Sequence, residues 1–309
     1  MNVTFEKRIS NMLPVIGKWP RVAKIALAKH LFKSRHGYLY DFYNPKNFIE
    51  KTWTYTVLYE NPVFEKYIDK YVFKETIENK LGDKKYVIPA FGVYETIDEI
   101  EDAWNTFPDE FYIKSTVSGN GRNMFLVKNK GDLDTKKLFL EIKKWFNPHN
   151  TLINSIDRSY RNLKPRVLVE KYMHDFGSES LRDYKFYCFN GTPYCLHTRS
   201  FDADCENFPR TFFDMQWNKI EATISNHPSA DHVDKPKHFE EMKSIASILS
   251  DGFPFARVDF YDTEDTPVVG EVTLGYPSSD IEPMDFNLEL GQKMVIPKKD
   301  LVRSSLFRK

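Results

Sequence analysis

Apolar residues recur at intervals of three and four along three segments in the first quarter of the chain. This spacing lines them up along one side of an α-helix, and each segment has a proline near its start, where a helix tolerates it. Gly82 follows the third segment, as is common at a helix end. The pattern therefore predicts helices over Arg21–Phe32, Pro45–Tyr59 and Pro62–Leu81.

After Gly82 the apolar runs become short or alternating, with turn residues between them. Such runs predict strands, at Lys85–Pro89, Phe111–Ser115, Met124–Lys128, Arg166–Glu170, Tyr184–Phe189, Tyr194–Arg199, Phe255–Tyr261 and Val268–Thr273. Helical spacing returns between some of them, from Thr96 to about Asn105 and at Leu133–Phe146 and Lys237–Leu249. Asn190-Gly191 is a two-residue hairpin signal, so the strands beside it should pair antiparallel. Polar stretches predict loops at Asn147–Lys164, after Arg199 and in the basic tail Lys293–Lys309.

This alternation over 309 residues favours a mixed α/β protein, either with two closely packed subdomains or with one elaborated α/β unit. Lys plus Arg and Asp plus Glu number 44 each, so no overall charge attracts nucleic acid or an acidic membrane. The 25 Phe and 17 Tyr are spread along the chain and do not alternate with basic residues as on a base-stacking surface. We therefore expect no nucleic-acid partner.

Cys188, Cys195 and Cys205 lack the Cys-x-x-Cys spacing of zinc and redox sites. We expect three reduced thiols, the first two within strands. Charges interrupt every apolar run, and Met1–Ser10 has no apolar signal-peptide core. We therefore expect no membrane span, no export and a location in the cytoplasm.

The most informative segments are two predicted neighbouring strands that carry Arg257 with Asp259, and Glu271 with Thr273. The two-residue period of a strand puts the members of each pair on one face. A hairpin can then bring two carboxylates, a hydroxyl and a guanidinium together. Oxygen ligands of this kind suit Mg²⁺, and an arginine can neutralise a phosphoryl group in transfer. The alternative is a charged edge hairpin facing solvent, although both strands are otherwise strongly apolar.

Lys114 lies near the end of the predicted strand Phe111–Ser115, just before the loop Ser118-Gly119-Asn-Gly121-Arg122. An ammonium group beside several backbone N–H groups can hold phosphate oxygens. The loop is not a Walker A sequence, because no Gly-Lys-Ser/Thr follows it. A plain hairpin turn is the alternative.

Glu170-Lys171 ends another predicted strand, and Met173 follows. The end of such a strand can offer backbone hydrogen-bonding groups to the edge of an adenine, while apolar side-chain atoms enclose the ring. Asp183 and Lys185 share a face of the next strand, where they can reach ribose and phosphate. The alternatives are a plain strand end, and an ion pair between Asp183 and Lys185.

His197 and Arg199 share a face of the strand after Asn190-Gly191. Arg199 can bind a substrate carboxylate through two parallel hydrogen bonds, or it can pair with an acid in the loop Asp202–Glu206. For His197 the alternative to catalysis is half-buried packing. No Ser/His/Asp or Cys/His arrangement suggests a protein nucleophile.

In this order along the chain, the features resemble the ATP-grasp superfamily, and within it the TupA-like family linked to teichuronopeptide and capsular polysaccharide synthesis. The resemblance runs from about Asn44 to Pro297. Its carriers are Asn61-Pro62, Asp69-Lys70-Tyr71, Ile88-Pro89-Ala-Phe-Gly92-Val-Tyr94, Asp183-Tyr-Lys185-Phe-Tyr-Cys-Phe-Asn-Gly191, Phe253-Pro-Phe-Ala-Arg257-Val-Asp259 and Gly270-Glu271-Val-Thr273.

The resemblance implies an ATP-grasp fold, in which two α/β subdomains clasp ATP, with a reduced helical N-terminal region instead of a complete third domain. We expect the helical region over residues 1–84 and the subdomain with the glycine-rich lid over 85–165. The subdomain with the adenine hinge and the metal site should cover 166–309.

The resemblance also implies ATP and Mg²⁺ as cofactors and suggests where they bind. The residues expected to contact the nucleotide are Lys70 or Lys74, Lys114, Ser118, Gly119, Gly121, Glu170, Lys171, Met173, Asp183 and Lys185. Asp259 and Glu271 would bind magnesium. Thr273 departs from the Asn of many ATP-grasp ligases, and its hydroxyl can ligate the ion or orient its water.

The implied activity is carboxylate–amine ligation, in which phosphoryl transfer from ATP gives an acyl phosphate that an amine attacks. The family setting suggests a sugar carboxylate, such as a hexuronic acid, with an amino acid or amino alcohol as the amine. Arg257 and Arg199 would bind the acceptor carboxylate. A sugar or polysaccharide phosphotransferase, and a non-catalytic ATP-binding scaffold, remain as alternatives.

Overall fold

The computed structural model describes residues 21–58, 62–119, 121–148, 160, 163–173, 182–200, 209–224, 227–275 and 280–297. The chain divides into two compact units. The first unit comprises Met1–Leu39, Asn61–Glu75 and Ile88–Met173, and the second comprises Tyr40–Glu60, Thr76–Val87 and His174–Lys309. The subdomain boundaries expected from the sequence stay a prediction.

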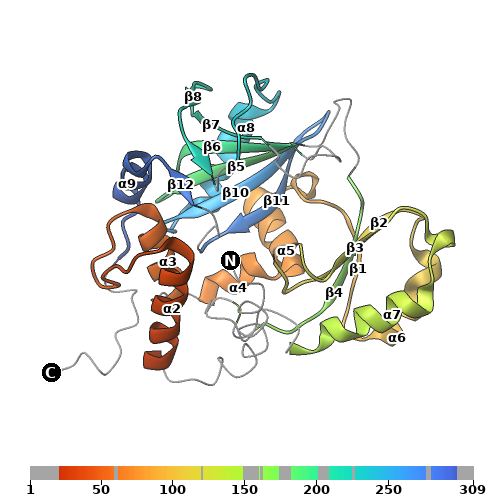
Figure 1. Cartoon of the computed structure of the whole chain (residues 1–309). Coiled ribbons are helices and arrows are strands. Elements are labelled where there is room, and N and C mark those ends of the chain that lie inside the picture. The colour runs from red at the N-terminus through yellow and green to blue at the C-terminus, as the bar shows by residue number, and fades with distance from the viewer. Residues whose placement is uncertain are drawn as a thin grey trace. The chain divides into compact units, whose positions relative to one another are not determined.

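A four-stranded antiparallel sheet forms the centre of the first unit, with strand order β1-β4-β2-β3. Its strands are β1 (Ala90–Tyr94), β2 (Phe111–Ser115), β3 (Met124–Val127) and β4 (Val167–Glu170). Helices α6 (Ile97–Ala103) and α7 (Thr135–Lys143) cover one face (Figure 1). Strand alternation sends Phe111 and Ile113 into the core beneath these helices.

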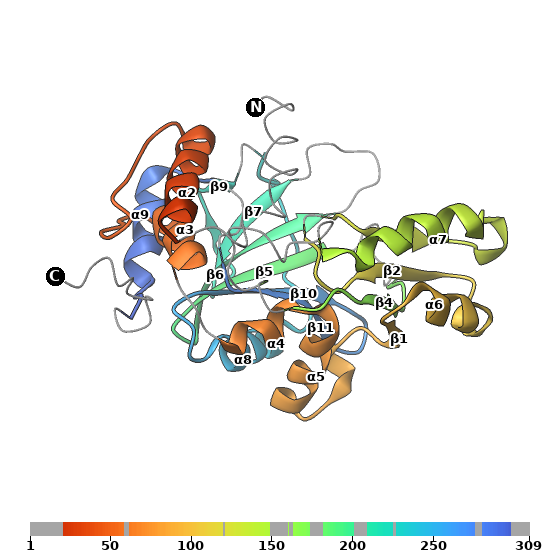
Figure 2. The same cartoon turned by 90° about the horizontal axis from the view of Figure 1, so that it is seen from below.

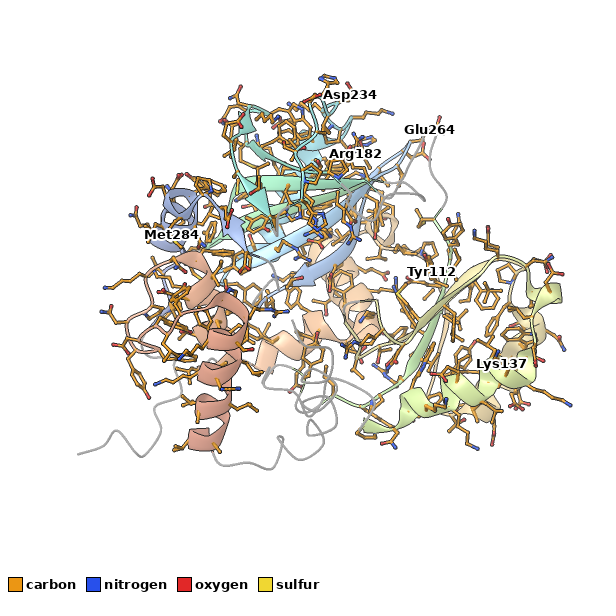
Figure 3. The ribbon with its side chains drawn as sticks, in the orientation of Figure 1. Tyr112, Lys137, Arg182, Asp234, Glu264 and Met284 are labelled. Atoms are coloured by element: carbon orange, nitrogen blue, oxygen red, sulfur yellow. The ribbon has the colours of Figure 1, made fainter. Side chains whose placement is uncertain are left out.

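Tyr112 and Lys114 consequently lie on the opposite face of this sheet. Figure 3 labels Tyr112 on that face and Lys137 on α7. One face of the sheet thus makes the core of the first unit, and the other face is available for polar chemistry.

The main difference between the predicted and the observed helices before the sheet concerns the third predicted helix. Helix α2 (Arg21–His36) begins where expected, but the long helix predicted at Pro62–Leu81 is divided into the 3₁₀ turn Pro62–Phe64, α4 (Glu65–Ile68) and α5 (Lys70–Leu81). Asp69 causes the division, because its carboxylate accepts hydrogen bonds from the backbone N–H groups of Tyr71 and Val72 at 3.0 and 3.1 Å. The side chain thereby caps the start of a new helix.

The strand predicted at Lys85–Pro89 is wrong. Residues Lys84–Tyr86 form a 3₁₀ turn, and β1 begins only at Ala90. The Asp83 side chain accepts a hydrogen bond from the backbone N–H of Lys85 at 2.9 Å and caps this turn. Val87 of the predicted segment forms an isolated bridge with Val269. The helix expected from Thr96 is present, and the Thr96 hydroxyl caps it by accepting a hydrogen bond from the Glu99 N–H at 3.3 Å.

The second unit contains a six-stranded antiparallel sheet with strand order β11-β10-β5-β6-β7-β8. Its strands are β5 (Arg182–Phe189), β6 (Thr192–Ser200), β7 (Arg210–Asp214), β8 (Lys219–Ile220), β10 (Ala256–Asp262) and β11 (Pro267–Thr273). A small separate pair joins β9 (Thr223–Ile224) to β12 (Ile281–Glu282). The predicted hairpin is confirmed, and Asn190 and Gly191 both have the positive φ that a type I′ turn requires.

Helices cover both faces of this sheet (Figure 2). On one face lies α8 (Phe239–Ser250), whose Phe239 ring is 5.9 Å from that of Phe186. On the other face α3 (Phe48–Leu58) places Phe48 5.9 Å from Tyr187, and α9 (Met284–Lys293) places Phe286 5.6 Å from Phe212.

Five of these elements were not predicted, namely β7, β8, β9, β12 and α9. Strand β7 lies in the segment expected to be a loop, and α9 lies ahead of the predicted polar tail. Gly291 of α9 lets the helix approach the chain before α3, because a Cβ there would stand 2.6 Å from the Lys46 carbonyl oxygen. Tertiary packing therefore places α9.

Cys188 and Cys195 are buried, free thiols in β5 and β6, as predicted. Cys205 and most of the predicted loop Asn147–Lys164 lie outside the described residues. Within the described part of the chain, no helix is both long and apolar enough to cross a membrane.

Candidate functional site

Glu170 is the centre of the candidate site in the first unit. It ends β4 on the polar face of the sheet and is 2% exposed. Lys74 of α5 binds one carboxylate oxygen at 2.8 Å, and Lys114 of β2 contacts the other. Three of the predicted nucleotide-binding residues thus form one cluster.

The charges in this cluster depend on one another. Burial alone would raise the pKa of Glu170, but Lys114 and Lys74 together hold it below its usual range. Burial lowers the pKa of Lys74, although Glu170 acts against this. Two lysines gathered on one buried carboxylate can also bind the oxygens of a phosphate chain.

The start of the predicted lid loop is hydrogen-bonded to Lys70, the first residue of α5. Lys70 donates its backbone N–H to the Thr116 carbonyl at 3.1 Å, and its ammonium contacts the Ser118 carbonyl. The Ser118 hydroxyl donates to the Ser115 carbonyl at 3.1 Å. Lys70 and Ser118, both expected to contact the nucleotide, therefore lie together, and their roles in binding it stay a prediction.

The tip of this loop has the backbone freedom that a lid needs. Gly121 has a φ of +69°, in the left-handed region, and is exposed. Gly119 accepts a hydrogen bond from the Arg122 N–H at 3.2 Å, which closes the turn. Asn120 lies outside the described residues.

The residues that follow β4 were predicted to form the adenine hinge. The backbone N–H of Lys171 donates to the Pro89 carbonyl at 2.9 Å, while its side chain is exposed. Tyr172 stands edge-on to Tyr112 with ring centroids 5.5 Å apart, and Met173 is half-buried. The hinge roles of Lys171 and Met173 stay a prediction.

In the second unit, the two strands predicted to carry the metal site form a hairpin. Arg257 pairs with Thr273 and Asp259 with Glu271 across β10 and β11, so all four side chains lie on one face. The register shifts between Asp259 and Phe260. The spatial part of the sequence prediction is confirmed here.

Asp259 is held by two cations. Arg257 donates to both of its oxygens at 2.7 Å, and Lys185 of the neighbouring β5 donates at 2.6 Å. Burial would raise the pKa of Asp259, but Arg257 and Lys185 hold it below its usual range. The carboxylate is therefore ionised and positioned.

Asp183 extends this network along β5. Lys185 also contacts it, at 2.9 Å, so the ion pair foreseen as the alternative for these two residues is present. Burial raises the pKa of Asp183, and the negative charge of Asp259 contributes in the same direction.

The oxygen donors on the hairpin fit magnesium. Glu271 is 59% exposed, and the Thr273 hydroxyl is a buried oxygen with no hydrogen-bond partner among the described residues. Mg²⁺ takes one or two carboxylates and keeps several waters or phosphate oxygens, so a small all-oxygen set suffices.

Sequence reasoning missed two polar residues of the same sheet face. The register places Arg210 of β7 opposite Arg199, while Tyr187 lies opposite Arg257. His197, expected to be a packing residue, is 3% exposed and contacts the rings of Tyr187 and Phe212. A short Thr-Phe-Phe run after Pro209 was the only sequence signal for β7.

Comparisons with known proteins agree with this fold. The profile of the family described as TupA-like ATPgrasp matches residues 52–295. A search of curated proteins gave no significant match.

Three of the solved structures that the chain resembles are the following. One is N5-carboxyaminoimidazole synthetase from Staphylococcus aureus complexed with ADP, at 18% identity and a TM-score of 0.36, covering 67% of this chain and 44% of that protein. D-alanine–D-alanine ligase from Helicobacter pylori matches at 13% identity and a TM-score of 0.41, covering 75% and 59%. The biotin carboxylase domain of Hydrogenobacter thermophilus 2-oxoglutarate carboxylase, in complex with MgADP, matches at 14% and 0.40, covering 71% and 42%.

The chain spans 42% to 59% of the length of these three proteins. The family match, by contrast, extends over most of the chain, from the middle of α3 to just beyond α9. It includes both the Glu170 cluster and the hairpin of Asp259 and Glu271. The chain therefore has the ATP-grasp fold and belongs to the TupA-like ATP-grasp family.

Proposed function

We propose that this protein is an ATP- and Mg²⁺-dependent, ADP-forming carboxylate–amine ligase. The observation that carries the proposal is the register of β10 and β11, which gathers Arg257, Asp259, Glu271 and Thr273 on one face. We further propose that its acceptor is a sugar carboxylate, such as a hexuronic acid, and that it acts in the cytoplasm in the synthesis of a capsular or cell-surface polysaccharide.

Each part of the proposed site has a chemical task. Asp259, Glu271 and Thr273 would hold magnesium, which offsets the charge of the phosphates when bound. Lys74 and Lys114 would bind phosphate oxygens, and Arg257 would neutralise the carboxylate as it accepts the γ-phosphoryl group of ATP. ADP leaves, the amine attacks the acyl carbon, phosphate departs, and the amine loses its proton to solvent.

Two assays distinguish this activity from its rivals. ADP release is measured with glucuronate alone and then with glucuronate plus a panel of amino acids and amino alcohols. A ligase needs both partners for sustained turnover. Turnover with glucuronate alone that leaves a stable phosphorylated sugar would identify a phosphotransferase, and ATP binding without ADP release under any condition would identify a scaffold.

The loop Ser118–Arg122 should become more protected when nucleotide binds. Its glycines give it conformational freedom, and closure over the phosphates would exclude water from a hydrolysis-prone acyl phosphate. Hydrogen–deuterium exchange with and without Mg-ATP measures this, with the β5–β6 turn at Asn190-Gly191 as a loop that should not respond. Equal exchange of Ser118–Arg122 in both states would remove its role as a lid.

Arg199→Lys should raise KM for the acid by about tenfold or more with little change in kcat. A lysine replaces two parallel hydrogen bonds to an oxyanion by a point charge, and a contact made before and during reaction acts on KM. Arg182→Lys is the matched control, because Arg182 lies on the opposite face of the same sheet. An unchanged KM in Arg199→Lys would assign this residue to structure.

A further inference from the structure

Two buried polar side chains beside the metal hairpin lack a hydrogen-bond partner. The Tyr187 hydroxyl of β5 and the His197 Nδ1 of β6 form no hydrogen bond with any described residue, and the two rings are 5.6 Å apart. Tyr187 is 0% exposed and His197 is 3% exposed. Leaving buried polar atoms unsatisfied costs free energy, so each such atom in a native protein needs an explanation. Neither side chain belongs to the set proposed to bind ATP, magnesium or the acceptor carboxylate.

The strand register puts both side chains next to the proposed reaction centre. Arg257, which would neutralise the acceptor carboxylate, is opposite Tyr187 across β10 and β5. Lys185, which donates to Asp259 at 2.6 Å, is opposite His197 across β5 and β6. Side chains opposed on one face of a sheet have Cβ atoms about 4.5–5.5 Å apart. A ligand group held at Arg257 therefore has Tyr187 as its neighbour, and His197 comes next on the same face.

Other close neighbours of the two rings are aromatic. Phe48 of α3 and Phe255 lie 5.9 and 6.0 Å from the Tyr187 ring, and Phe212 of β7 lies 5.4 Å from the His197 ring. Phenylalanine side chains carry no nitrogen or oxygen that could form a hydrogen bond with the two polar atoms. A partner for these atoms therefore has to come from the side of the sheet face where the charged residues lie.

The charged groups on this face already contact groups of opposite sign. Lys185 contacts Asp183 at 2.9 Å and Asp259 at 2.6 Å, and Arg257 donates to both oxygens of Asp259 at 2.7 Å. Asp183 also interacts with Arg199. These contacts match charge with charge, so the missing hydrogen-bonding group does not have to be an ion.

The two unpartnered side chains are themselves neutral. Burial lowers the pKa of His197, and the positive charges of Lys185 and Arg257 lower it further. Burial raises the pKa of Tyr187, so the phenol keeps its proton. A neutral imidazole Nδ1 accepts or donates one hydrogen bond according to its tautomer, and a phenol can do both. A hydroxyl group, which also donates and accepts, matches each of them.

We propose that Tyr187 and His197 bind ring hydroxyl groups of the acceptor while Arg257 meets its carboxylate. In a uronic acid ring, the carbon next to the one that carries the carboxylate has a hydroxyl group, so these two groups are neighbours, as Arg257 and Tyr187 are. A second hydroxyl farther round the ring then reaches His197. The site thereby selects carboxylates that carry hydroxyl groups over those that carry none. This inference rests on the proposed ligase function for the placement of the reacting carboxylate.

Binding of two acids that differ in their hydroxyl groups tests the inference without turnover. Glucuronate and tetrahydropyran-2-carboxylate share a six-membered ring with one oxygen and a carboxylate on the next carbon, but only glucuronate carries hydroxyl groups. Isothermal titration calorimetry with a non-hydrolysable ATP analogue and Mg²⁺ should show glucuronate binding about tenfold or more tightly, because the bare acid leaves the buried polar atoms unpaired. Equal affinities, or no binding of glucuronate, would overturn the inference.

Tyr187→Phe and His197→Phe should each weaken glucuronate binding about tenfold and leave the binding of tetrahydropyran-2-carboxylate unchanged. Tyr184→Phe makes the same change as Tyr187→Phe on the opposite face of β5 and should keep both wild-type affinities. Because the Tyr187 hydroxyl has no hydrogen-bond partner among the described residues, Tyr187→Phe should also keep the wild-type unfolding temperature. An equal loss of affinity for both acids in Tyr187→Phe would assign this residue to structure and overturn the inference.

ADP release, measured separately, distinguishes this inference from the proposed function. A preference for glucuronate that depends on Tyr187 and His197, without ADP release under any condition, would retain the hydroxyl site and reject the ligase. ADP release that needs both acid and amine, without this preference, would retain the ligase and reject the hydroxyl site.

Discussion

Asp259→Asn should lower ATP turnover on the order of a hundredfold or more. The residue is proposed to ligate magnesium and orients Arg257 through two hydrogen bonds of 2.7 Å, so its loss affects both groups that offset charge at the phosphoryl transfer. Removing one such electrostatic contact typically costs about 10²- to 10³-fold in kcat. Steady-state ADP release at saturating substrates measures the effect.

The controls separate chemistry from folding. Asp259 is buried between Lys185 and Arg257, so thermal unfolding of the variant must be measured alongside turnover. Asp262→Asn changes a carboxylate on the same strand that binds His238 at 2.7 Å outside the proposed site, and its turnover should stay near the wild-type value. Near wild-type turnover of Asp259→Asn at limiting Mg²⁺ would reject the metal assignment.

Glu271→Gln should affect magnesium binding without affecting the stability of the fold. Its side chain is 59% exposed and 3.6 Å from Arg257, so the fold depends on it little. We expect the variant to need a higher Mg²⁺ concentration for half-maximal turnover while its unfolding temperature stays nearly unchanged. An unaltered Mg²⁺ requirement would remove Glu271 from the ligand set.

Alternation along each strand predicts that Arg257 shares a face with Asp259, and Glu271 with Thr273. The pairing of the two strands at this point could not be predicted. The register beside the turn would place Asp259 opposite Gly270, and the shift between Asp259 and Phe260 places it opposite Glu271 instead. Gly270 lies next to this shift, and a Cβ there would stand 2.8 Å from the Tyr261 ring, a contact that only the folded sheet reveals.

The Glu170 cluster shows the limit of sequence reasoning more clearly. Each of Lys74, Lys114 and Glu170 was a candidate by itself, but they lie on α5, β2 and β4, and nothing in their spacing indicates that both lysines bind the same carboxylate. Arg210 was missed for a similar reason. Strand β7 is short and follows a polar stretch, so its pairing with β6 depends on the sheet that is already present.

Glu170→Gln should lower the free energy of unfolding by about 3–5 kcal/mol, because removing one partner of a buried ion pair leaves uncompensated charge. Lys74 would be most affected, since burial already lowers its pKa and no other carboxylate in the described residues pairs with it. Lys74 can respond by losing its proton, which would place the effect at the lower end of this range. Chemical denaturation near neutral pH measures the difference from wild type.

The pH dependence identifies the cause of this loss. The pKa of Glu170 is lower in the folded protein than the value of about 4.3 expected for the unfolded chain, so its stabilising contribution is complete above that value and is lost as the pH falls through the folded-state pKa. The stability difference between wild type and Glu170→Gln should therefore shrink below about pH 4. Glu95→Gln, which breaks an exposed ion pair with Lys164, should change stability little at any pH. A difference for Glu170→Gln that stays constant through the acid range would show that the shape of this residue, rather than its charge, stabilises the fold.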